Sequence, residues 1–154
     1  EYADGDHPRI IEYLQTVDTA AIGELTDEVS WCSAFVNWVM EQAGYRGTDS
    51  AAARSWLHWG RAISWPKIGA IVVLRRGTQS WQGHVGFVVG VDHGLLLVLG
   101  GNQANSVNIS PYKLDRVLAY RWPVEPATTS RIDMLPVLPM PVSGPRKWWQ
   151  FWRT

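Results

Sequence analysis

Apolar residues in the first third of the chain follow the period of amphipathic helices. The strongest pattern spaces six side chains at i, i+3, i+4, i+7, i+8 and i+11: Cys32, Phe35, Val36, Val39, Met40 and Ala43. This pattern predicts a core-facing helix with Ser30 as its N-cap and Gly44 as its end. We also expect a helix after His7-Pro8 and a short helix over residues 51–59.

After residue 65 the pattern changes to short apolar runs separated by turns. The expected strands are residues 70–74, 84–91, 95–99, 107–110 and 117–122, with a hairpin turn at Asp92-His93-Gly94. Sequential strands joined by tight turns favour an antiparallel sheet. The sequence therefore predicts an α+β fold in which N-terminal helices pack on a central antiparallel sheet.

Proline usage divides the chain into a predicted domain, residues 1–122, and a Pro/Trp-rich C-terminal tail, residues 123–154. The tail holds six of the nine prolines, which disfavour regular helix or central strand. Its last nine residues flank Trp148, Trp149 and Trp152 with cations, a pattern that suits contact with a membrane interface. The alternative is that this segment packs on an apolar patch of the domain.

Composition excludes several classes of function. The 154 residues carry 14 basic and 14 acidic side chains, so the chain lacks the basic footprint of a nucleic-acid-binding protein. The single cysteine excludes an internal disulfide and a Cys-rich zinc site, and no metal or cofactor is expected.

Three residues in order could form a nucleophilic site. Cys32 lies at a predicted helix start, where the macrodipole lowers the pKa of a thiol and makes it a better nucleophile. His84 opens a strand on whose face Gly86 leaves room for that helix, and Asn102 ends the next strand, where its amide could orient the imidazole. Each residue alone has a structural alternative: a buried small hydrophobe, a strand-end histidine and a turn asparagine.

The segments around these residues resemble a known family. Trp31-Cys32-Ser33-Ala34-Phe35-Val36, Gly83-His84-Val85-Gly86-Phe87 and Val98-Leu99-Gly100-Gly101-Asn102-Gln103 are similar to motifs of the papain-like NlpC/P60 and CHAP cell-wall hydrolases, in a branch of short bacterial and phage proteins. The resemblance covers roughly residues 7 to 123.

The resemblance implies a peptidoglycan endopeptidase or amidase that cleaves stem-peptide amide bonds through a thioester. Cys32 would be the nucleophile, His84 the general base and acid, and Asn102 the orienting residue. Many papain-like enzymes carry an oxyanion-stabilising Gln before the cysteine, but residues 25–31 contain none. CHAP enzymes often carry an acid just before the third residue, where this chain has Gly100 and Gly101.

Several side chains are candidates for binding peptidoglycan. Trp31, Trp56 and Trp81 could stack on sugars or cover apolar stems, Asp27 and Glu28 could bind a stem amine, and Arg54 could bind a stem carboxylate. For each, the alternative is an ordinary core or solvated side chain.

Two further functions stay open: a non-catalytic cell-wall-binding module on the same fold, and a papain-like deamidase or acyltransferase that acts on a protein. Action at the bacterial cell wall, in the periplasm or outside the cell, follows from the resemblance. A phage lysin, a secreted effector and a remodelling enzyme remain alternatives. An immunity or inhibitor protein would be a partner if the protein is a secreted effector.

Overall fold

The computed structural model describes residues 7–18, 20 and 30–124. The helices are α1 (Pro8–Leu14), α2 (Cys32–Gln42) and two 3-10 helices, η2 (Ala53–His58) and η3 (Leu114–Arg116). The strands are β1 (Arg61–Ile63), β2 (Ile71–Arg75), β3 (Gly83–Asp92), β4 (Leu95–Gln103), β5 (Ser106–Lys113) and β6 (Val117–Trp122). The candidate ligands Asp27 and Glu28 and the C-terminal tail lie outside the described residues, so the predicted domain boundary stays a prediction.

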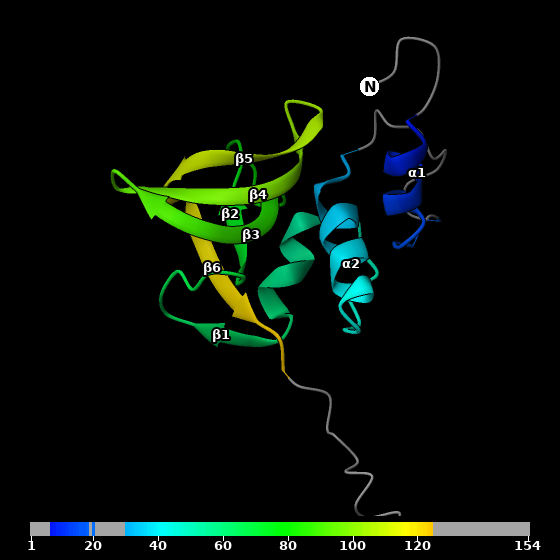
Figure 1. Ribbon diagram of the computed structural model, residues 1–154, viewed down its shortest axis with the longest axis horizontal. Helices are drawn as coiled ribbons and strands as arrows, with labels where there is room; N and C mark the ends of the chain where they lie inside the picture. Colours follow the sequence, from blue (N-terminus) through cyan, green and yellow to red (C-terminus); the bar gives the residue numbers. More distant parts are fainter. Residues whose placement is uncertain (1–6, 19, 21–29, 125–154) are drawn as a thin grey trace, which may run out of the picture. The chain divides into compact units, whose positions relative to one another are not determined.

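Six strands form one sheet in the order β1-β6-β2-β3-β4-β5, and every neighbouring pair is antiparallel. Helices α1 and α2 lie together on one side of it (Figure 1). This arrangement confirms the α+β, papain-like fold. The short edge strand β1 was not predicted, because its three residues show too little alternation to be recognised in the sequence.

Helix α2 covers the predicted span but begins differently. Its N-cap is Trp31, with no side-chain hydrogen bond to the helix, so the prediction of Ser30 as N-cap is wrong. The predicted end is confirmed: Gly44 has a φ of +80°, and the Tyr45 amide donates to Met40 O at 2.9 Å. The third predicted helix is present as η2, with 3-10 geometry.

The two faces of the sheet support two apolar clusters. On the helix side, Val85 and Phe87 of β3 pack with α1, α2 and η2. On the opposite face, Val88, Leu96 and Val98 pack with residues of β2 and β6. Strand alternation places His84 and Gly86 on this second face, so the expectation that α2 approaches the Gly86 face is wrong. The close approach of the helix occurs at Gly101 of β4, where a Cβ would lie 2.6 Å from the Trp31 ring.

The segment between α2 and η2 is anchored to α2 by buried hydrogen bonds. Asn37 is fully buried, and its Oδ1 accepts from the Thr48 and Asp49 amides at 2.7 and 3.1 Å. Ser33 Oγ donates to Ser50 O at 2.6 Å and accepts from Trp56 Nε1 at 2.9 Å. These bonds fix the position of the residues that follow, 51–53, relative to the start of α2.

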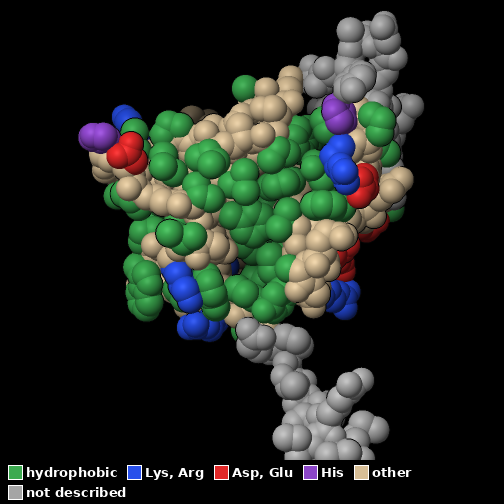
Figure 2. Space-filling view, in the orientation of Figure 1, with side chains coloured by type: hydrophobic (Ala, Val, Ile, Leu, Met, Phe, Trp, Pro, Cys, Tyr) green, Lys and Arg blue, Asp and Glu red, His purple; other side chains and the backbone are tan. Residues whose placement is uncertain are grey.

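The described surface is poor in charge. Figure 2 shows hydrophobic side chains across the middle of one face and charged side chains toward its edges, in line with a charged content of only 18%. No helix among the described residues is long and apolar enough to cross a membrane.

Candidate active site

Cys32 is the first residue of α2, and its thiol is almost completely buried. The backbone amides of Val85 and Ser33 donate toward the sulfur, and Ser30 Oγ lies 3.9 Å from it. Burial nevertheless raises the pKa of the Cys32 thiol above its usual value, since it outweighs these donors and the positive charge of Arg76. The expectation of a lowered pKa at the helix start is therefore wrong for the unliganded site, where Cys32 is a thiol at neutral pH.

His84, at the start of β3, precedes the residue whose amide contacts the Cys32 sulfur. Its side chain is 4% exposed and stacks on Tyr112, with the ring centroids 5.6 Å apart. Burial lowers its pKa from 6.5 to about 4; the hydrogen bond that His84 donates to Gln103 opposes this shift, and Arg76 and Arg116 add to it. The imidazole is therefore neutral at neutral pH and able to accept a proton.

The side chain that holds the imidazole is Gln103. Its Oε1 lies 3.1 Å from His84 Nε2 and also accepts from the Tyr112 hydroxyl at 2.8 Å. Asn102, the expected orienting residue, lines a pocket of about 230 Å³ with His84 and Gln103, but the His84 hydrogen bond goes to its neighbour. Gln103 stands in the same sequence motif as Asn102, and only the backbone geometry distinguishes the two.

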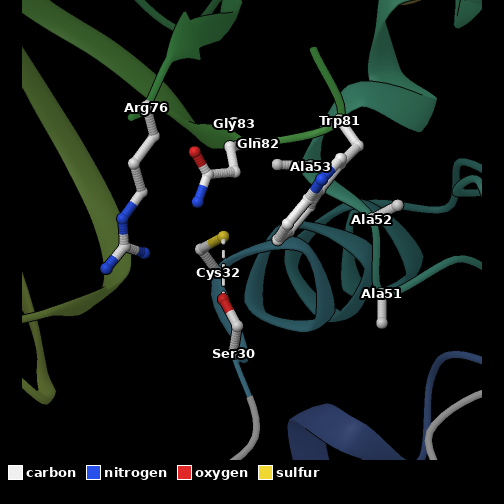
Figure 3. Close-up of a pocket in the computed structure, with 9 residues that line it drawn as sticks. All are labelled: Ser30, Cys32, Ala51, Ala52, Ala53, Arg76, Trp81, Gln82 and Gly83. Atoms are coloured by element: carbon white, nitrogen blue, oxygen red, sulfur yellow. Dashed lines mark hydrogen bonds between the residues drawn. The ribbon is translucent and has the colours of Figure 1, made fainter. Parts of the chain in front are cut away.

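A second pocket, of about 400 Å³, opens at the Cys32 sulfur. Its described lining residues are Ser30, Cys32, Ala51, Ala52, Ala53, Arg76, Trp81, Gln82 and Gly83. Figure 3 shows the Trp81 ring and the Gln82 amide directed into the space around the sulfur. Arg76, which sequence reasoning missed, lines both pockets, and neither pocket has an acidic side chain among its described lining residues.

The candidate substrate-binding residues have different surroundings. Trp81 is 73% exposed and lines the pocket beside Cys32. Trp31 and Trp56 are buried in the core, Trp31 against Gly101 and Trp56 against Ser33. Arg54 Nε donates to Gln82 O at 2.7 Å. This hydrogen bond holds the backbone that leads into β3.

A buried thiol at a helix start, in contact with the backbone at the start of a strand of an antiparallel sheet, defines a papain-like α+β protein. Residues 25–102 match the model of the CHAP domain family, and the chain belongs to this family. Membership indicates a hydrolase of the peptidoglycan hydrolase or amidase class, with peptidoglycan as substrate and the cell wall as the place of action. No curated protein matches the chain.

Proposed function

We propose that the protein cleaves an amide bond in the stem peptide of peptidoglycan, with Cys32 as nucleophile and His84 as general base and acid. One observation carries this proposal: the Cys32 sulfur contacts the backbone amide of Val85, the neighbour of His84, and opens into a pocket of about 400 Å³, large enough for a peptide.

The first half of the reaction forms a thioester. Because Nε2 of His84 is engaged by Gln103, Nδ1 is the ring nitrogen that accepts the Cys32 proton as the sulfur attacks the scissile carbonyl carbon. The tetrahedral intermediate then collapses, the C–N bond breaks, and the imidazolium returns the proton to the leaving amine. The raised pKa of Cys32 and the lowered pKa of His84 make the resting pair neutral, so proton transfer accompanies attack.

The second half releases the product. A water molecule gives a proton to Nδ1 of His84 and attacks the thioester carbonyl. The C–S bond breaks, the imidazolium returns the proton to the sulfur, and the peptide leaves as a carboxylic acid that loses its proton to solvent. The Cys32 backbone amide, at the N-terminus of α2, is the donor we propose for the oxyanion in both halves.

Two side chains are suited to hold the substrate. Trp81 offers an exposed ring beside the sulfur for an apolar or sugar face. Arg76 makes no hydrogen bond or ion pair with another described residue, whereas Arg116, the other cation of the smaller pocket, donates to Arg75 O. We propose that Arg76 binds a stem-peptide carboxylate, a role for which Arg54 is not placed.

Digestion of purified sacculi tests the proposal. The wild-type protein should release soluble fragments with new peptide termini, identified by mass spectrometry, and Cys32→Ala should release none while keeping the wild-type melting temperature. Intact sacculi after prolonged incubation with a folded, reduced wild-type protein would contradict the proposal.

The two alternative functions give different results in the same experiments. A non-catalytic binding module would sediment with sacculi without cleaving them, and iodoacetamide labelling of Cys32 would not depend on His84. A deamidase or acyltransferase would show His84-dependent labelling with no change in the sacculi.

A further inference from the structure

The amide of Gln103 is buried and held in one orientation. Its side chain is 5% exposed, and Nε2 lies 2.6 Å from Asn108 O and 3.3 Å from Val98 O and Gly100 O. A flipped amide would place its oxygen against these carbonyl oxygens, which can only accept. The amide oxygen is therefore directed at His84, and the Tyr112 hydroxyl donates to the same oxygen.

This orientation determines which nitrogen of His84 carries the proton. An amide oxygen accepts hydrogen bonds and cannot donate, so the Nε2 atom facing it must be the N–H. In a neutral imidazole the other nitrogen, Nδ1, is then unprotonated and free to act as a base.

Two backbone features bring Gln103 to this place. Residue 100 is glycine, and a Cβ there would lie 3.0 Å from His84 Nε2 and 3.1 Å from Gln103 Oε1, so a side chain at this position would fill the space that the amide uses. The β4–β5 register then shifts between Gly100 and Gln103, and Asn102 has a φ of +56°. At this bend Gln103, and not the expected Asn102, faces the imidazole.

We propose that Gln103 is the positioning residue of this site: it holds His84 as the Nε2–H tautomer and leaves Nδ1 to exchange a proton with Cys32. The catalytic consequence rests on the proposed function, whereas the tautomer rests on the hydrogen-bond geometry alone. Tyr112 completes the arrangement, because it stacks on the imidazole and donates to the same amide oxygen.

Nitrogen-15 NMR of imidazole-labelled protein tests the tautomer directly, with the His84 signals assigned by their loss in His84→Gln. In the wild-type protein, Nε2 of His84 should be protonated and Nδ1 unprotonated. Gln103→Met, similar in length but without an amide, should lose this preference and lower kcat on sacculi about tenfold, the effect of one lost hydrogen bond. Gln103→Glu keeps an oxygen facing His84, and its second oxygen must carry a proton to donate to the carbonyl oxygens of Asn108, Val98 and Gly100, so this variant should keep the Nε2–H tautomer.

Asn102→Gly distinguishes Asn102 from Gln103 as the residue that positions His84. Glycine tolerates the positive φ at this position, so the substitution removes only the side chain. It should retain the wild-type tautomer. Asn105→Gly, which makes the same change at the turn residue with a φ of +56°, should retain both the tautomer and kcat.

The proposal would be overturned by an Nδ1–H tautomer in the wild-type protein, or by loss of the Nε2–H preference in Asn102→Gly. An unchanged tautomer in folded Gln103→Met would also overturn it. If Gln103→Met fails to fold, Gln103→Glu decides: retention of the Nε2–H tautomer in that variant supports the proposal, and its loss contradicts it. Sacculi left intact by the wild-type protein would contradict the proposed function without affecting the NMR result.

Discussion

Acidification should destabilise the fold through the buried His84 imidazole. Burial lowers its pKa from 6.5 to about 4 in the folded protein, whereas an unfolded chain keeps the ordinary value. Between these values the unfolded state binds more protons, so the free energy of unfolding must rise with pH across this window and fall as the pH drops. The full shift corresponds to about 3 kcal/mol, of which roughly 2 kcal/mol is lost between pH 7 and pH 5.

Urea denaturation followed by tryptophan fluorescence at pH 7, 6 and 5 measures this effect. Other titrating groups contribute to the wild-type protein and to His84→Gln alike, so the difference between their pH dependences isolates His84. The wild-type protein should lose about 2 kcal/mol more than His84→Gln between pH 7 and pH 5. His93→Gln, at a histidine whose side chain is 91% exposed, should follow the wild-type protein. Parallel curves for the wild-type protein and His84→Gln would refute the reasoning.

Four further predictions concern the pocket and its support. Trp81→Ala should raise KM for a soluble muropeptide about fivefold with little change in kcat, and Trp65→Ala, at another exposed tryptophan, should leave both unchanged. Gly100→Ala should lower kcat on sacculi about tenfold, because its Cβ would lie 3.0 Å from Nε2 of His84, the proposed base. Arg76→Gln should reduce kcat/KM for stem peptides with free carboxylates more than for amidated ones; equal losses would contradict the carboxylate role. Asn37→Ala should reduce the free energy of unfolding by about 2–4 kcal/mol in urea denaturation, because two backbone amides lose their acceptor.

The sequence was sufficient for the fold class because most elements have a clear period. The apolar stripe of α2 and the apolar runs of β2 to β4 need only local information. Helix α2 and strands β2 and β3 lie close to their predicted spans, whereas β4 extends four residues further, to Gln103. The contact of the Cys32 sulfur with the Val85 amide agrees with the expectation that the start of α2 lies near the start of β3, although the helix approaches the other face of that strand.

The sequence predictions that were wrong concern properties set by contacts between residues distant in the sequence. Which residue of Asn102-Gln103 faces His84 is decided by a register shift against β5, and no local pattern encodes it. The Cys32 pKa depends on how deeply α2 packs, and burial outweighs the helix start there. Trp56 is buried in the core, and its indole N–H donates a hydrogen bond to Ser33, 23 positions away in the sequence.

The wall of the pocket opposite Arg76 is built from three consecutive alanines, residues 51–53, in a segment that Asn37 and Ser33 attach to α2. Methyl groups leave the space beside the sulfur wide, and larger side chains there would narrow it. The proposed base, His84, draws its support from β4 and β5, on other elements. Under the proposed function, substitutions at residues 51 and 52 should therefore change which stem peptide is accepted without moving His84. These two positions are the natural starting point for changing the specificity.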